Sequence, residues 1–309
     1  MNMFKSERYA PDAPELNAFK HGGGCVAMAV LVDLIVMLGM LVIVPAGLRL
    51  TGDAAAAGTG RAWLLFAVPG AVSLWLPRGT LATALAAWYG LGTLLLAVAA
   101  ARRLARTRSL APAEVAVLTA LVSPSVAATA LVAERRGHPL FGFDLEILDL
   151  TVPHFHFAGF AAALVAGLVC RSTTRPAGTL AALSVPLGTL LVLLGYFVDD
   201  WAELAGAVVL TAGMWTVALL TWQDLRARTH DRVTGALLAV SAAVLVATML
   251  LALSWALGEA TGLPHPNLAW MAATHGLANA LGFGLCSVLA WRRLATAPAE
   301  RPHPEEIPA

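Results

Sequence analysis

The sequence predicts an all-α, polytopic membrane protein in which about nine α-helices cross a lipid bilayer as a bundle. Of its 309 residues, 59% are hydrophobic and only 13% are charged, whereas soluble domains carry about 25% charged residues. The mean hydropathy is +0.75. A soluble chain of this composition could not cover its surface with polar groups, but a bilayer accepts an apolar exterior.

Nine segments are apolar enough to approach the roughly 20 residues that a spanning helix needs. The second is short, because Pro77-Arg78-Gly79 ends it. We expect residues 1–24 to form an extramembrane tail, 25–295 a single transmembrane domain, and 296–309 a disordered tail rich in Pro and Glu. The nine segments are roughly 25–48, 61–76, 80–101, 112–133, 151–170, 178–198, 202–222, 233–257 and 268–291.

The positive residues predict how the helices are oriented, because Arg and Lys stay on the cytoplasmic side. Alternate connections divide the 20 positive residues into sets of 14 and 6. We therefore expect the C-terminus in the cytoplasm and the N-terminus outside, in a bacterial plasma membrane. The larger set is Arg49, Arg61, Arg102, Arg103, Arg106, Arg108, Arg171, Arg175, Arg226, Arg228, Arg232, Arg292, Arg293 and Arg301, and the smaller is Lys5, Arg8, Lys20, Arg78, Arg135 and Arg136.

Histidines and acids gather at the outer ends of these helices. His154 and His156 open the fifth segment, His275 lies about two turns into the ninth, and Asp199-Asp200 forms the turn before the seventh. Ionisable residues within spanning helices are costly and usually face the bundle interior. Imidazole is also a common metal ligand, so His154, His156 and His275 with one carboxylate could bind a divalent metal such as zinc or iron.

Helix geometry restricts that metal site. Residues two apart on an α-helix point about 200° apart, so at most one of His154 and His156 faces the core unless Pro153 marks the true helix start. His275 and Asn279 are four apart and share a face. Gly159, Gly276 and Gly282 would let neighbouring helices approach closely.

Plainer readings stand beside these. His275 could simply hydrogen-bond a neighbouring helix, the acids at 144–149 could form a solvated loop, and Asp199-Asp200 could be a polar turn. Asp33 lies well inside the first helix and could pair with a His or Arg of another helix. The net charge of +1 and the absence of a Walker A motif give no argument for nucleic acid or nucleotide as a partner.

Two stretches carry a family resemblance. His154-Phe-His-Phe-Ala-Gly-Phe160 and His275-Gly-Leu-Ala-Asn-Ala-Leu-Gly-Phe283 resemble the signature segments of the YndJ-like bacterial integral membrane proteins. The resemblance is specific in the C-terminal half of the chain. It implies where the site lies rather than its chemistry, and its members are sometimes labelled transporters. The residues it nominates are His154, His156, Gly159, His275, Asn279 and Gly282.

Three functions remain open from the sequence. The first is a membrane-embedded enzyme acting on an apolar or lipid-like small molecule, with His154, His156, His275, Asn279 and Asp200 as the catalytic candidates. The second is a proton- or ion-coupled transporter using the same residues. The third is a non-catalytic membrane subunit. Clustering of His and acids at one face, rather than along a path through the membrane, favours the enzyme.

Overall fold

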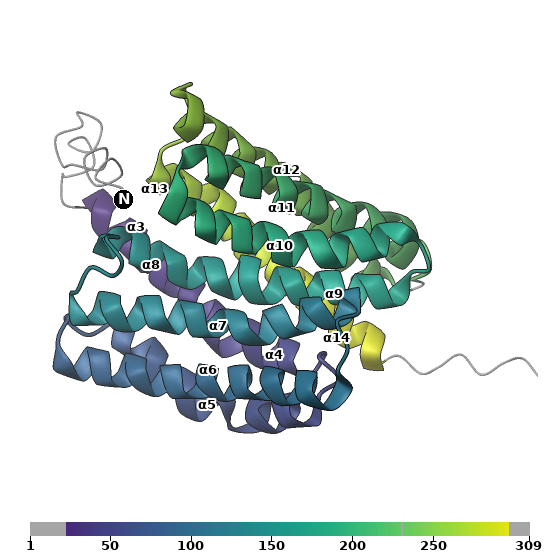
Figure 1. Ribbon diagram of the computed structural model, residues 1–309, viewed down its shortest axis with the longest axis horizontal. Coiled ribbons are helices and arrows are strands. Elements are labelled where there is room, and N and C mark those ends of the chain that lie inside the picture. The colour runs from purple at the N-terminus through teal and green to yellow at the C-terminus, as the bar shows by residue number, and fades with distance from the viewer. Residues whose placement is uncertain (1–22, 230, 297–309) are drawn as a thin grey trace, which may run out of the picture.

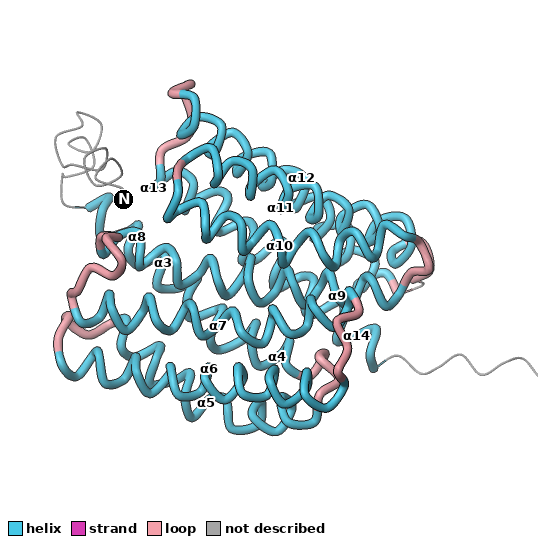
Figure 2. Tube along the Cα trace, viewed as in Figure 1, coloured by secondary structure: helices cyan, strands magenta, loops and turns pink. Residues whose placement is uncertain are grey.

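The structure is a computed structural model that describes residues 23–229 and 231–296. In this part the chain forms nine helical rods packed side by side (Figures 1 and 2), and its only β-bridge joins Leu140 and Phe143. The rods are α3 (Gly23–Leu38) continued by the π-helical segment η1 (Gly39–Ile43) and α4 (Val44–Leu48); α5 (Ala54–Leu74); α6 (Thr80–Thr107); α7 (Pro112–Arg136); α8 (Leu145–His154) with η2 (Phe155–Ala161) and α9 (Ala162–Ser172); α10 (Pro176–Val198); α11 (Asp200–Leu220) with η3 (Thr221–Arg226); α12 (Arg232–Thr261); and α13 (Leu268–Met271) with η4 (Ala272–Gly276), η5 (Asn279–Leu285) and α14 (Cys286–Thr296).

Successive rods run in opposite directions, so α3 begins at one end of the bundle and α14 finishes at the other (Figure 1). We call these the N-terminal end and the C-terminal end. Eight rods are long and apolar enough to cross a membrane, and the remaining one, α5, contains the shorter apolar helix Leu64–Leu74. The predicted all-α fold of about nine helices is confirmed, and the chain is a multi-pass membrane protein. The predicted tails at 1–24 and 296–309 lie almost wholly outside the described residues.

The fifth rod begins earlier than the sequence predicted. Its helix starts at Leu145 rather than at 151, because the Asp144 side chain accepts a hydrogen bond from the Ile147 backbone N–H (3.0 Å) as an N-cap. Glu146 then lies in the first turn, where a negative charge suits the helix dipole. The interpretation of 144–149 as a solvated loop was therefore wrong. Pro153 lies inside the helix and does not mark its start.

The rod α8–η2–α9 is the central one. Of its most apolar 18 residues, 78% are buried inside the bundle, against 28–56% in the other spanning rods. Its π-helical segment η2 packs against η1 of the first rod and η5 of the last. Wide π-type turns often occur at functional sites, and here three of them meet in the middle of the bundle.

Ion pairs and helix caps join neighbouring rods at the C-terminal end of the bundle. Arg103 donates from Nε and Nη2 to Glu114 (2.7 and 2.8 Å), which joins α6 to α7. Asp231 caps α12 and also accepts from Arg293 of α14 (2.8 Å). The hydrogen bond from the Thr234 hydroxyl and the pairing with Arg293 hold the pKa of Asp231 well below its usual range.

Glycines let α10 and α11 approach backbone to backbone. A Cβ added at Gly188 would lie 2.5 Å from the Leu210 backbone, and one added at Gly195 would lie 2.4 Å from that of Glu203. Contacts this short leave no room for any side chain. The close hairpin fixes where α11 presents its residues to the interior, Glu203 among them.

Replacing Gly188 with Ala is expected to destabilise the protein by about 1–3 kcal/mol, because the new methyl group meets backbone that cannot rotate away. Gly235→Ala is the matched control. Nothing lies within 4 Å of its added Cβ, and Ala is favoured over Gly in a helix by up to ~1 kcal/mol. Denaturant unfolding of both variants in micelles measures the difference, and equal stability of the two would contradict the packing.

Candidate functional site

A cavity of about 410 Å³ lies inside the bundle, in the half towards the N-terminal end. It is enclosed mainly by the central rod, α10, α11, α12 and the last rod. Most of its lining is apolar, and its volume falls within the 300–1,000 Å³ typical of small-molecule sites. Polar and ionisable lining residues include His154, Tyr196, Glu203, His275 and Asn279.

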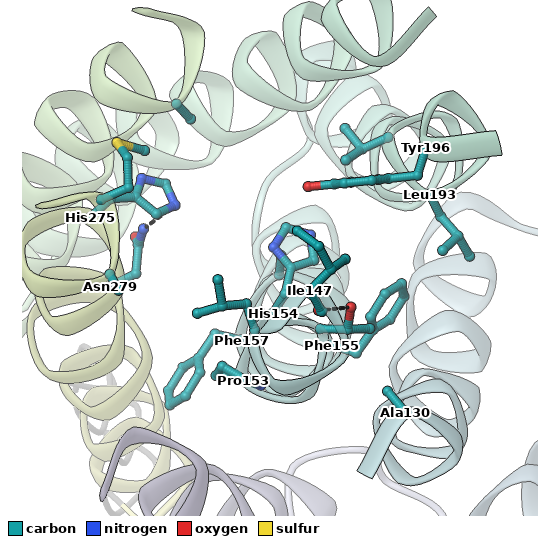
Figure 3. Close-up of a pocket in the computed structure, with 18 of the residues that line it drawn as sticks. Ala130, Ile147, Pro153, His154, Phe155, Phe157, Leu193, Tyr196, His275 and Asn279 are labelled. Atoms are coloured by element: carbon teal, nitrogen blue, oxygen red, sulfur yellow. Dashed lines mark hydrogen bonds between the residues drawn. The ribbon is translucent and has the colours of Figure 1, made fainter. Parts of the chain in front are cut away.

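His154 faces this cavity from the central rod, as Figure 3 shows. It lies nine residues beyond the start of α8, roughly 14 Å along the helix at 1.5 Å per residue. Its imidazole makes no hydrogen bond to any residue of the described chain. It packs edge-on against the Phe155 ring, with 5.6 Å between the ring centroids. Both of its nitrogens are thus available to a ligand in the cavity.

His156 lies on the opposite side of the same rod and is fully buried. Its Nδ1 lies 2.7 Å from the Val152 carbonyl oxygen, so Nδ1 must carry a proton to donate. Its Nε2 lies 2.6 Å from the Tyr89 hydroxyl of α6, which donates to it. The neutral imidazole is therefore fully satisfied, and it joins two rods.

The predicted metal site of His154, His156 and His275 is not formed. Both nitrogens of His156 bond groups on the side of the rod away from the cavity. Residues two positions apart on a helix point to nearly opposite sides, so His156 cannot face the cavity together with His154. Among the described residues, no group of three or more His, Cys, Asp or Glu side chains is placed to hold a metal ion. The geometric restriction drawn from the sequence holds, and His154 is the member of the pair that faces the cavity.

His275 is held by two hydrogen bonds. Its Nδ1 donates to the Thr248 carbonyl of α12 (2.8 Å), and its Nε2 accepts from the Asn279 amide (3.2 Å). The Thr248 hydroxyl in turn lies 3.0 Å from the Asn279 Oδ1. This closed set ties the last rod to α12, so the plainer reading of His275 as an interhelical hydrogen-bonding residue describes its contacts, although its ring also lines the cavity.

Thr248→Val is expected to cost about 0.6–1.7 kcal/mol of stability, the range measured for interhelical hydrogen bonds in membrane proteins. The Thr248 main-chain bond to His275 remains, so the loss reports the hydroxyl, which is shared between Asn279 Oδ1 (3.0 Å) and the Val244 carbonyl of its own helix (2.8 Å). Thr216→Val is the control, because the Thr216 hydroxyl bonds only its own helix at Ala212. A cost at position 248 no larger than at 216 would remove the proposed cross-link.

Asp200 does not line the cavity, and Asp199 serves as the N-cap of α11 by accepting from Ala202 N–H (2.7 Å). One turn further on, Glu203 is 4% exposed and takes the cavity-facing position instead. Glu203 is engaged in an interaction within the described structure. The prediction of Asp200 as a catalytic carboxylate therefore loses its support, because Asp200 is not among the residues that line the cavity.

A second cluster of charges lies outside the cavity at the N-terminal end. Glu134, 1% exposed, pairs with Arg78 (2.7 Å) and with its neighbour Arg135. Arg135 also donates to the Leu74 carbonyl (3.0 Å) in the last turn of α5. Asp33 lies in the field of Arg135 and Glu134, without a salt bridge within 4.0 Å among the described residues.

Aromatic side chains surround the cavity at the N-terminal end. Leu140 to Phe143 form a tight turn with hydrogen bonds in both directions (3.2 and 3.0 Å), and both central residues, Phe141 and Gly142, have positive φ. Such backbone is strained for a bulky residue. The Phe143 ring packs edge-on against those of Phe197 and Tyr196, with ring centroids 5.1 and 6.0 Å apart.

The comparisons with known proteins give one match. The model of the family described as YndJ-like protein matches residues 34–283, which is most of the chain. The chain belongs to the YndJ-like family. No curated protein and no solved structure matches it. The matched range includes both signature segments, so the resemblance drawn from them is confirmed as membership.

Several residues important to this YndJ-like protein carried no signal in its sequence. Tyr89, Thr248 and Tyr196 lie in helices read only as apolar spans, and hydropathy does not say which helices are neighbours. The prediction that small residues let helices approach closely is confirmed at two of its three glycines. A Cβ at Gly159 would lie 2.7 Å from Ser123 of α7, and one at Gly282 would lie 2.6 Å from Val244 of α12. It is wrong at Gly276, where the nearest atom of a neighbouring helix, on Ile35, is 3.8 Å from the added Cβ.

Proposed function

We propose that this YndJ-like protein is a membrane-embedded enzyme that moves a proton on an apolar or lipid-like small molecule, with His154 as general acid and base. The observation that supports it is the contrast between the two cavity histidines. His275 has both nitrogens engaged, whereas His154 bonds no described residue and faces the cavity.

The chemistry follows from the imidazole itself. A neutral imidazole offers one acceptor and one N–H donor, so His154 can take a proton from one atom of a bound molecule and return one to another, as an isomerisation requires. The mostly apolar lining offers few hydrogen-bond partners to competing water. His275 and Asn279 form a fixed wall opposite, and we assign them a positioning role rather than proton transfer.

The metal-dependent version has less support. It needs a third ligand beside His154 and His275, and the third predicted histidine is bound to Tyr89 on the far side of the rod. A transporter remains the alternative, because the same cavity could bind a passenger and His154 a coupling proton. A non-catalytic subunit is the remaining possibility, and the test below separates the enzyme from these two.

Deuterium incorporation tests the enzyme without a named substrate. Protein in nanodiscs of total bacterial lipid is incubated in D₂O, and the extracted lipids are compared by mass spectrometry. We expect at least one species to gain deuterium or change structure with the native chain and with His138→Ala, whose histidine is exposed, and not with His154→Ala. Turnover that survives His154→Ala, or no turnover by the native chain, overturns the proposal.

We further propose that the N-terminal end of the bundle faces outside and the C-terminal end faces the cytoplasm of a bacterium. The support is the placement of positive residues, since 13 of the larger set of 14 lie in the connections at the C-terminal end or in the adjoining helical turns, and Arg301 lies outside the described residues. A fluorescent protein fused after Ala309 should fluoresce, and alkaline phosphatase fused there should be inactive. The reverse pattern would contradict the orientation.

A further inference from the structure

The charges around the cavity restrict what it can hold. Within the described chain no Lys or Arg lines it, and its ionisable residues besides Tyr196 are His154, Glu203 and His275. A phosphate or carboxylate buried there would lack a counter-charge, which costs several kcal/mol in an apolar environment. Arg78 and Arg135, at the same end of the bundle, are both paired with Glu134. The described lining therefore offers an anionic head group no cation.

The described lining also offers no uncommitted negative charge to a cationic head group. Glu203, the one carboxylate among the described lining residues, is already engaged in an interaction within the structure. The two histidines offer no negative charge. Charge complementarity thus favours a ligand with no net charge.

The hydrogen-bonding groups show which neutral head group fits. The Thr129 and Thr151 hydroxyls donate to carbonyls of their own helices, at Ser125 (2.8 Å) and Ile147 (2.7 Å). His275 is committed as well. Tyr196 is engaged in an interaction within the structure, as Glu203 is. His154 remains, with one donor and one acceptor, and Figure 3 shows its ring among the cavity-lining side chains. One hydroxyl or carbonyl group matches this set.

The rest of the cavity suits a hydrocarbon. Most of the remaining lining is apolar and includes Phe157, Met214, Met249 and Phe283. Met214 lies 14 residues into α11, roughly 21 Å from that helix's N-terminus, whereas Tyr196 lies near the end of α10. The cavity therefore extends from the N-terminal end towards the middle of the bundle.

We propose that the cavity takes an uncharged amphiphile, whose single hydroxyl or carbonyl group hydrogen-bonds His154 and whose hydrocarbon body fills the apolar remainder. This inference rests on the proposed function only in taking the cavity to be the ligand site. It names the substrate class, a long-chain or prenyl-type alcohol or carbonyl compound, and excludes phosphorylated and acidic lipids.

Photo-crosslinking with matched probes tests it. Three C16 probes carry the same mid-chain diazirine and differ only in the head group, which is a hydroxyl, a sulfonate that stays ionised, or a trimethylammonium. We expect the alcohol to label peptides containing Phe157, Met214 or Met249, unlabelled hexadecanol to compete, and the sulfonate to label them at least tenfold less. His154→Ala should reduce labelling by the alcohol about threefold to tenfold, the equivalent of one uncharged hydrogen bond, whereas His138→Ala should not.

Equal labelling by the sulfonate, strongest labelling by the trimethylammonium probe, or labelling confined to lipid-facing residues would each overturn the inference. The readout is binding, so its failure differs from that of the proposed function. A labelled cavity without turnover would leave the neutral ligand standing and remove the enzyme. Turnover of an acidic lipid would support the enzyme and overturn the inference that the ligand is uncharged.

Discussion

Replacing His156 with Ala is expected to lower the free energy of unfolding by about 3–5 kcal/mol. The change removes a fully buried ring, which leaves a void comparable to a large-to-small core substitution. It also leaves the Tyr89 hydroxyl without its partner inside the bundle. Gly39 and Gly70 pack closely against the Cβ atoms of His156 and Tyr89, so both side chains are held in a tightly packed part of the bundle. Denaturant unfolding in micelles measures the loss.

His154→Ala is the matched comparison, two residues away. That ring makes no hydrogen bond to the described chain and already faces a cavity, so we expect its stability to stay within about 1 kcal/mol of the native protein. Tyr89→Phe should cost about 1–3 kcal/mol, because it strands the Nε2 of His156. If both histidine variants lost similar stability, the assignment of the two to different environments would be wrong.

Glu134→Gln is expected to destabilise the protein by about 3–5 kcal/mol. Glu134 is the carboxylate partner of the buried Arg135, and removing one member of a buried ion pair leaves the other charge uncompensated. The damage should extend to the end of α5, whose last carbonyls Arg135 caps. The measurement is the midpoint of chemical unfolding.

The double variant Glu134→Gln/Arg135→Met should be more stable than Glu134→Gln alone, because it removes the stranded charge. Glu146→Gln, an exposed acid in the first turn of α8, is the control and should stay within about 0.5 kcal/mol. A Glu134→Gln protein as stable as that control would show that the pair contributes nothing.

The fold was predictable because lipid imposes it. Hydropathy alone located all nine rods, since every spanning segment must be apolar and helical. The boundaries failed where polar residues extend a helix beyond the hydrocarbon. The acids at 144–149 read as a loop, yet Asp144 caps the helix that they begin. The second segment, predicted at 61–76, corresponds to α5 (Ala54–Leu74), which begins seven residues earlier in a stretch of Ala and Gly and ends two residues sooner.

The site was predictable only in part. Helix geometry said that His154 and His156 face apart, but not which faces the ligand, because that depends on which helices surround the central rod. The partners of both His156 and His275, Tyr89 and Thr248, lie far away in the chain. Glu203 rather than Asp200 lines the cavity because it lies one turn further into α11, whereas Asp200 is the first residue of that helix.

The central claim is that His154 faces a ligand cavity while Val152 and His156, two residues away on either side of it on the same rod, do not. In a chain whose native cysteines, Cys25, Cys170 and Cys286, are replaced by Ala, a His154→Cys protein should react with an apolar maleimide, and hexadecanol should protect it. Val152→Cys, whose position is fully buried and does not line the cavity, should stay unmodified while folded. Equal reactivity at positions 152 and 154, or no protection at 154, would contradict the account.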